Sequence, residues 1–217
     1  MNVNRQAARS ASTRAKLIKA ARALFARHGY AGVATEEIAR RAGVTRGALY
    51  HQFPAKEDLF LAVYEQVEQE LTEGVDRRLG EVTSPFAALR DGVRVFLEAC
   101  RAPEVQRIVL LDGPAVLGWE RWREVAERYG LGLMEAVIAA AVEAGELKPV
   151  AVAPLAHLLM GALDEAALLI ARDPEAVETV PATFELLLEG LRTPRGRGPR
   201  RGTAGRAPRG RASGEQD

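Results

Sequence analysis

The sequence contains little of what stabilises secreted or membrane-embedded proteins. Its 217 residues include one cysteine, Cys100, which excludes a disulfide framework within the chain and favours a reducing compartment. The N-terminal stretch MNVNRQAARSASTR lacks the apolar core of a signal peptide. No apolar run reaches the roughly 20 residues that a membrane-spanning helix needs. We therefore expect a cytoplasmic protein with no membrane partner.

Groupings of catalytic or metal-binding residues are also missing. The three histidines, His28, His51 and His157, are scattered along the chain, and Cys100 has no partner near it in the sequence. We find no metal-ligand spacing, no nucleophile motif and no phosphate-binding loop. We therefore expect no catalytic residues, no metal and no cofactor. An enzyme on a helical scaffold remains a less favoured alternative.

Negatively charged residues are scarce at each end of the chain and abundant in the middle. Residues 1–56 carry eleven Lys and Arg against two acids, a net charge of +9. Residues 57–192 carry twelve basic residues against twenty-five acids, and residues 193–217 carry seven Arg against two acids. A basic head on an acidic body indicates that the head contacts a polyanion, without distinguishing DNA from RNA or a membrane surface.

Apolar residues recur at helical spacing, and no strand pattern or repeat stands out. In 13–28, Leu17, Ala21 and Leu24 belong to one apolar stripe. Thr35 is expected to cap the next helix. Pro181 is expected to kink or divide the last helix. The full set of expected helices is 13–28, 35–42, 45–53, 56–79, 85–100, a short one from 103, 118–144, about 154–172 and about 174–190, with a break at 112–114. The fold class is therefore all-α.

The stretch GVTRGALYHQF, residues 43–53, predicts the second half of a helix-turn-helix motif. It follows the short helix 35–42 across the linker AGV. At 100° per residue, Leu49 and Phe53 lie together on the side that packs against the protein. The opposite side consists of Arg46, Gly47, Tyr50 and His51. A recognition helix enters the major groove N-terminus first, which places this side against DNA.

Each residue on the exposed side suits contact with DNA. The Arg46 guanidinium can reach a guanine edge from the first helical turn. Gly47 weakens the helix by about 1 kcal/mol, but it lets the backbone approach the bases closely. Tyr50 and His51 can donate hydrogen bonds to phosphates. Taken singly, Tyr50 is more often a packing residue and His51 a solvated one, so the DNA interpretation depends on the whole motif.

Residues 12–71 resemble the N-terminal DNA-binding domain of TetR-family transcriptional regulators. The resemblance is carried, in order, by LFARHGY, IARRAGV, GALYHQF and KEDLF. It implies an all-helical homodimer whose first three helices bind a palindromic operator and whose remaining helices bind a small molecule that releases the DNA. Carried over to this chain, the DNA-facing residues are Thr35, Thr45, Arg46, Gly47, Tyr50, His51 and Lys56. Ala55 departs from the family pattern, in which a capping Ser or Thr is frequent at this position.

The body, residues 72–192, offers weaker signals. Trp119 and Trp122 share a helical face and are interpreted either as core residues or as ligand contacts. Phe96, Cys100 and Met134 are pocket candidates with the same alternative. The last two long helices carry more apolar surface than one face can hold, which predicts a four-helix interface with a second copy or a wholly internal core. The interface candidates are Leu155, Leu159, Ala162, Ala166, Phe184 and Leu188.

The sequence therefore predicts a flexible N-terminal arm (1–11), a DNA-binding domain (12–71, with the motif at about 34–53), a helical ligand-binding and dimerisation domain (72–192) and a disordered Arg/Gly/Pro-rich tail (193–217). The tail either adds nonspecific DNA affinity or is a neutral extension. The expected function is that of a ligand-responsive regulator, with repression as the family default. The expected partners are double-stranded operator DNA, a second copy and a small apolar or aromatic effector. A constitutive DNA-binding protein without a ligand is the main alternative.

Overall fold

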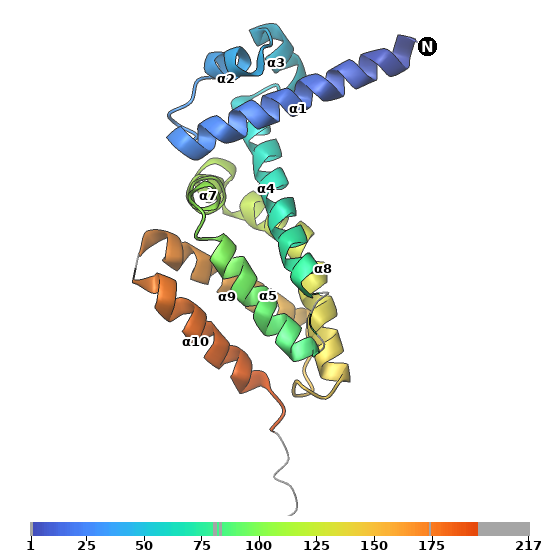
Figure 1. Cartoon of the computed structure of the whole chain (residues 1–217), viewed down its shortest axis with the longest axis vertical. Coiled ribbons are helices and arrows are strands. Elements are labelled where there is room, and N and C mark those ends of the chain that lie inside the picture. Colours follow the sequence, from blue (N-terminus) through green and yellow to red (C-terminus); the bar gives the residue numbers. More distant parts are fainter. Residues whose placement is uncertain (1, 80–81, 83, 174, 195–217) are drawn as a thin grey trace, which may run out of the picture.

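A basic helical head stands on a longer helical body in the computed structural model (Figure 1), which describes residues 2–79, 82, 84–173 and 175–194. The tail predicted over 193–217 lies outside these residues from position 195 onward. The described residues form helices and one isolated bridge between Leu147 and Arg192, so the fold is all-α.

The head contains α1 (Asn2–His28), α2 (Thr35–Ala42) and α3 (Arg46–Gln52). The predicted boundaries of α2 and α3 agree with the structure within one residue. The arm expected at 1–11, in contrast, is helical from Asn2 onward. No Gly or Pro interrupts 2–28, and alanine at several of these positions has the highest helix propensity. Ser10 also accepts a hydrogen bond from the side chain of Gln52 at 2.8 Å, which joins this part of α1 to α3.

The long helix α4 (Lys56–Leu79) runs from the head into the body (Figure 1). Its N-terminus is capped from within, because the Asp58 carboxylate accepts a hydrogen bond from the Ala55 backbone N–H at 2.9 Å. This is one half of a capping box, since it satisfies the Ala55 N–H, whereas the alanine side chain offers no acceptor to the first helical turn. Head and body are therefore joined by one continuous element.

The body places α5 and α8 against α4, and α9 and α10 on the side away from it. Its elements are α5 (Pro85–Ala99), α6 (Pro103–Val105), the π-helix η1 (Gln106–Asp112), α7 (Gly113–Leu117), α8 (Trp119–Glu143), α9 (Val152–Arg172) and α10 (Ala176–Leu191).

Two interruptions expected from the sequence do not occur. The break predicted at 112–114 is a passage from η1 into α7, and Pro114 is tolerated there because it lies in the first turn of α7. The chain turns instead at Gly118, with φ of 76°. Helix α10 continues through Pro181 and is not divided.

Two groups of buried apolar residues hold the molecule together. The first includes Phe25 of α1, Leu49 of α3, Phe60 of α4 and Ile108 of η1, so it crosses from the head into the upper body. The second joins α5, α8, α9 and α10 in the lower body. The head and η1 therefore share one core of packed side chains.

Helix α9 is long and apolar enough to cross a membrane by length and composition alone. This differs from the expectation that no apolar segment reaches that length. Half of its most apolar window is buried inside the fold. Residues such as Leu163 and Ile170 pack in the lower core. The apolar composition of α9 is thus largely explained by its place in the body.

Candidate nucleic-acid interface and body cavity

A tight turn between α2 and α3 presents the predicted recognition helix. Gly43 ends α2 with φ of 67°, a left-handed conformation that glycine adopts without steric cost. Thr45 caps α3, and its hydroxyl accepts a hydrogen bond from the Ala48 N–H at 3.1 Å. Leu49 and Phe53 are buried, as predicted. The hydroxyl of Thr45 is therefore engaged in capping while the side chain stays exposed.

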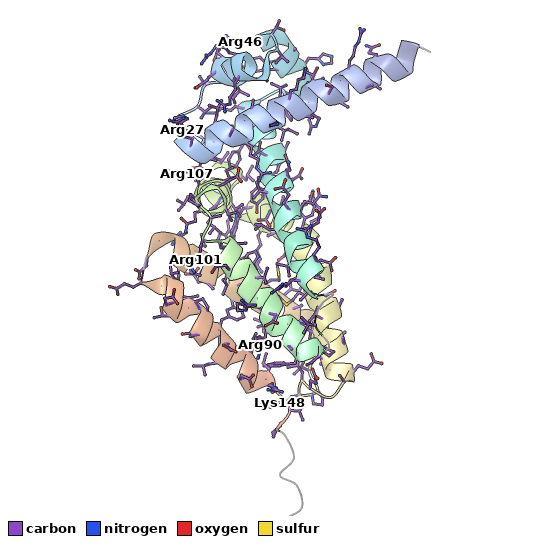
Figure 2. All side chains as sticks on the ribbon, in the orientation of Figure 1. Arg27, Arg46, Arg90, Arg101, Arg107 and Lys148 are labelled. Carbon is purple, nitrogen blue, oxygen red and sulfur yellow. The ribbon has the colours of Figure 1, made fainter. Side chains whose placement is uncertain are left out.

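Arg46 lies at the far end of the head, opposite Lys148 at the foot of the body (Figure 2). Its side chain is 64% exposed and forms an ion pair with Glu36 at 2.9 Å. Its guanidinium also lies over the ring of Tyr50, 5.5 Å from the centroid. The Arg46 guanidinium and the Glu36 backbone both lower the pKa of the Glu36 carboxyl, with the backbone contribution larger. Arg46 is thus exposed but held toward α2 when no other anion is near.

Gly47 and His51 lie on the exposed side of α3. A Cβ atom at Gly47 would meet only the Thr45 hydroxyl at 4.0 Å, and the residue has an ordinary helical φ. Neither crowding nor backbone conformation inside the chain requires glycine at this position. Close approach of an external backbone or base gives a physical reason for it.

Thr35 differs from its expected role in two ways. The N-cap of α2 is Ala34, and Thr35 is the first residue of the helix. The Thr35 side chain is buried, and its hydroxyl shares a hydrogen bond with the Tyr50 hydroxyl at 3.1 Å. Thr35 therefore orients Tyr50, which is 38% exposed, and presents little surface of its own.

Lys56 also has partners that the sequence did not indicate. Its ammonium donates a hydrogen bond to the Tyr30 carbonyl and lies 4.1 Å from the centre of the Tyr30 ring. Burial lowers the pKa of Lys56, and the Asp112 carboxylate opposes that shift. These contacts hold the Lys56 ammonium against the protein, although a cation at a helix N-terminus is mismatched with the helix dipole. A phosphate contact by Lys56 remains a prediction that requires its side chain to turn outward.

The structure identifies a cluster between head and body that sequence reasoning missed. Arg22 of α1 makes a bidentate ion pair with Glu104 of α6 at 2.8 and 2.9 Å, and it also contacts Glu70 of α4 at 2.7 Å. The Tyr30 N–H donates to Asp112 of η1 at 2.7 Å. These residues lie up to 82 positions apart in the chain, so no local pattern could have paired them.

A cavity of about 80 Å³ lies between α4, α5, η1, α8 and α9. Of the predicted pocket residues, Phe96, Trp122 and Met134 line it. Cys100 and Trp119 do not. Cys100 is fully buried in the shared core, where burial raises its pKa. Trp119 is 54% exposed, and its ring lies against that of Trp122, with the ring centroids 4.9 Å apart.

Trp122 connects the cavity wall to its surroundings. Its indole N–H donates to the Val109 carbonyl of η1 at 2.9 Å, and its own carbonyl accepts from the Tyr64 hydroxyl at 3.0 Å. A Cβ atom at Gly113 would stand 2.8 Å from the indole ring, so only glycine fits beside it. The position of Trp122 is thus fixed from α4, η1 and α7.

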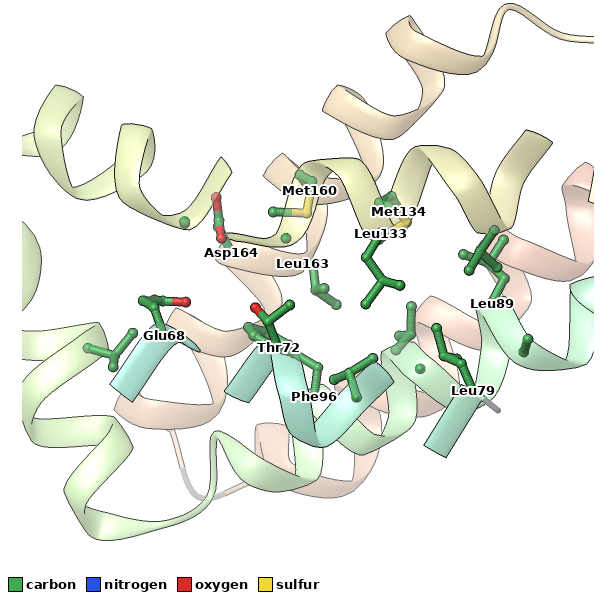
Figure 3. A pocket seen from close by; sticks show the side chains of 18 of the residues that line it. Glu68, Thr72, Leu79, Leu89, Phe96, Leu133, Met134, Met160, Leu163 and Asp164 are labelled. Atoms are coloured by element: carbon green, nitrogen blue, oxygen red, sulfur yellow. The ribbon is translucent and has the colours of Figure 1, made fainter. Parts of the chain in front are cut away.

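One end of the cavity is acidic, although sequence reasoning singled out neither acid. Glu68 of α4 and Asp164 of α9 lie near that end, and Leu79 and Leu89 lie at the other (Figure 3). Glu68 is 7% exposed, and burial raises its pKa to about 7. Burial also raises the pKa of Asp164 to about 6, although Arg123 opposes that shift. Two acids on helices separated by 96 positions could not be joined from the sequence.

The predicted dimer-interface residues divide into two groups. Leu159, Ala166, Phe184 and Leu188 are at most 6% exposed within a single chain and belong to the lower core, so their assignment to an interface is wrong. Leu155 and Ala162 are half-buried. The periodicity of these helices identified an apolar excess but could not distinguish the inner face from the outer one. The large exposed apolar residues of the two helices are Leu158, Leu169, Leu186 and Leu187.

Comparison with known proteins gives a consistent result. A family model described as bacterial regulatory proteins of the tetR family matches residues 17–63. A model described as the tetracyclin repressor-like C-terminal domain matches residues 86–191. The chain is similar to the transposon Tn10 TetC protein of Escherichia coli, with 28% identity over 74% of this chain and 81% of that protein.

Two further similarities extend this result. The transcriptional regulator CymR of Pseudomonas putida is 32% identical over 59% of this chain and 68% of that protein. The crystal structure of a TetR-family transcriptional regulator from Pectobacterium atrosepticum aligns with a TM-score of 0.80 at 35% identity, over 87% of this chain and 98% of that chain. These matches are to transcriptional regulators, not to enzymes.

Proposed function

Because the chain belongs to the TetR family of bacterial transcriptional regulators, we propose that it is a ligand-responsive repressor that binds a palindromic operator as a homodimer in the cytoplasm. A small, largely apolar or aromatic molecule releases it from DNA. The observation that carries the ligand response is the apolar cavity of the body, because its wall includes η1, which also contacts the head.

On the DNA side, residues 12–71 act as the DNA-binding domain, and α3 enters the major groove. Arg46 reads a base edge after leaving Glu36, while Tyr50 and His51 bind phosphates. The exchange of Glu36 for DNA costs little free energy, because exposed ion pairs are screened by solvent and contribute little to stability. The net basic charge of the head supports this orientation.

Residues 72–192 act as the ligand-binding and dimerisation domain. On α9, Leu155, Leu158, Ala162 and Leu169 share one helical face at spacings of three, four and seven residues. Leu186 and Leu187 of α10 are 74% and 56% exposed. Such apolar exposure on two neighbouring helices supports a seam between two copies. In the dimer, the two α3 helices would address half-sites about 34–36 Å apart, or one further turn.

The route from cavity to head runs through η1. Val109 and Leu110 line the cavity, and Asp112 on the same π-helix accepts the hydrogen bond from Tyr30. A ligand that displaces η1 changes this contact and tilts the head. Since both heads must keep one spacing to fit one operator, a small tilt suffices to lose a half-site.

The test is binding of the full-length protein to the DNA upstream of its own gene, measured by fluorescence anisotropy at several salt concentrations. We expect binding that weakens as salt rises and a compound from a hydrophobic-metabolite screen that reverses it. A genomic pull-down of bound DNA supplies the duplex if the upstream region does not bind. Failure of the protein to bind any recovered duplex would contradict the proposal.

A constitutive DNA-binding protein is the second candidate, and the small volume of the cavity favours it. Ligand pockets usually enclose about 300–1,000 Å³, whereas this cavity encloses about 80 Å³. In that case the body only dimerises, and no compound both binds the protein and releases its DNA. The same screen separates the two candidates.

A further inference from the structure

The shape and the polarity of the cavity limit the chemical class of ligand that it can bind. It extends along α4 from Glu68 to Leu79, eleven residues apart, which corresponds to about 16 Å along a helix. A volume of about 80 Å³ spread over that length gives a narrow space, so it suits an unbranched chain better than a ring.

The acidic end lacks a matching positive charge. Among the described residues, no Arg, Lys or His forms an ion pair with Glu68. Asp164 has only Arg123, at 3.4 Å, and Arg123 is closer to Glu127, at 3.0 Å. Of the three carboxylates near this end, Asp164 and Glu127 share one guanidinium.

The remaining contact of Glu68 does not neutralise it. The Tyr64 hydroxyl is within hydrogen-bonding reach of the Glu68 carboxyl, but it also donates to the Trp122 carbonyl at 3.0 Å. A hydroxyl has one proton to donate. Glu68 thus presents toward the cavity a carboxyl that is 7% exposed, is hydrogen-bonded to Tyr64 and has no ion pair with a cation among the described residues (Figure 3). Burying a carboxylate in this way is costly unless a cation or a proton joins it.

Other groups at the same end suit a cation with several donors. Thr72 lies one turn after Glu68 on α4 and also lines the cavity, so its hydroxyl oxygen is available on the same side. The indole of Trp122 forms part of the wall and can attract a cation through its ring face. An ammonium has three N–H donors and no acceptor, which matches acceptors on Glu68, Asp164 and Thr72.

We propose that the cavity binds a linear alkyl amine, whose ammonium pairs with Glu68 and Asp164 and whose chain extends along α4 toward Leu79. This inference rests on the proposed function, because it takes this cavity to be the effector site. The chain contacts the apolar wall, including Phe96 and Leu163, and the amine supplies the missing positive charge. An alkyl carboxylate would add a fourth negative charge and is excluded.

The experiment is isothermal titration calorimetry of the full-length protein with hexylamine, 1-hexanol and hexanoate, probes of equal chain length. It is performed at a pH of about 8, where Glu68, with a pKa of about 7, is ionised. Hexylamine should bind most tightly. Glu68→Gln should weaken the binding of hexylamine by about 10- to 100-fold, which is the usual range for a lost hydrogen bond to a charged group. The affinity for 1-hexanol should stay nearly unchanged.

Two further variants complete the design. Glu73→Gln makes the same change at an exposed position of α4 and should leave all three affinities unaltered. Asp164→Asn should also weaken hexylamine selectively. Equal or tighter binding of 1-hexanol or hexanoate, no binding of hexylamine, or an equal loss in Glu73→Gln would each overturn the proposal.

A second measurement on the same samples tests the proposed regulatory function separately from amine binding. Anisotropy of a labelled duplex recovered by genomic pull-down reports DNA binding and release. Selective, Glu68-dependent binding of hexylamine supports the amine site whether or not DNA is released. Loss of DNA binding, or binding that hexylamine never reverses, counts against the regulatory function alone.

Discussion

At the scale of single residues, Arg46 is the proposed base-reading side chain. Arg46→Ala should cost about 1–3 kcal/mol on the specific site and relax the preference for one base, because a bidentate contact to guanine is lost. Competition binding to duplexes that differ at one position measures both effects. Arg101→Ala is the control, since Arg101 is an exposed arginine of the body paired with Glu98. Unchanged operator affinity in Arg46→Ala would remove Arg46 from base recognition.

Glu68 gives a prediction about pH. The Glu68 carboxyl has a usual pKa of 4.5 and a pKa of about 7 in the folded chain. As the pH rises between these values, the unfolded state loses its proton first, so the fold loses up to about 3 kcal/mol of stability. Asp164 acts in the same direction over a lower range, with Arg123 opposing and Glu127 reinforcing it. Tyr64 and Cys100 also face this region, and burial raises the pKa of both.

Glu68→Gln should therefore be more stable than the wild type above pH about 7 and show a flatter dependence between about 5 and 7. Urea unfolding followed by circular dichroism at several pH values measures this difference. The exposed variant Glu73→Gln should retain the wild-type profile. A Glu68→Gln protein that is less stable than the wild type at high pH would show that the carboxylate is well paired in the fold.

At the scale of elements, the outer faces of α9 and α10 determine assembly. Leu187→Glu places a charge on the exposed side of α10, so we expect a folded monomer that no longer binds the palindrome. Leu188→Glu buries a charge in the lower core, where the side chain is fully buried, and should unfold the body. Light scattering and circular dichroism separate the two outcomes. Ala139→Glu, an exposed change on α8, should remain dimeric. A wild-type protein that is monomeric at micromolar concentration would rule out the seam.

At the scale of the whole molecule, communication depends on the contact between η1 and the head. Asp112→Ala removes the acceptor for the Tyr30 N–H. The affinity of an effector for the protein should be retained. In the wild type, the effector is expected to weaken DNA binding by about 5–150-fold, and in Asp112→Ala this factor should fall toward one. Parallel titrations of effector and operator measure the coupling, and Asp76→Ala, at an exposed position of α4, is the control. If the effector still released DNA fully from Asp112→Ala, the coupling would not pass through the hydrogen bond between Asp112 and Tyr30.

The emission of Trp122 gives an independent reading of the same coupling. Trp122 lines the cavity and hydrogen-bonds to η1, whereas Trp119 is largely exposed. An effector should change the fluorescence of the wild type with the midpoint of DNA release. This change should persist in Trp119→Phe and disappear in Trp122→Phe. Release without any change in emission would indicate a site other than this cavity.

The sequence by itself determined the helical class, most helix boundaries and the position of the recognition helix. These properties depend on local order: the 3.6-residue period, caps such as Thr45, and Gly43 at the turn. The inward side of α3, with Leu49 and Phe53, follows from the same period. Local signals failed at residues 2–11 and 112–114, where the chain is helical, and Pro181 does not divide α10, while the kink predicted there stays a prediction.

Only the tertiary structure decided which residues meet across long separations. The ion pair of Arg22 with Glu104 and the acidic end formed by Glu68 and Asp164 join helices far apart in the chain. Tertiary packing also determined which apolar face of α9 and α10 is internal, since Leu188 and Leu187 are neighbours with equal hydrophobicity and opposite exposure. Periodicity specifies that a helix has faces, but only the neighbouring helices determine which face loses contact with water.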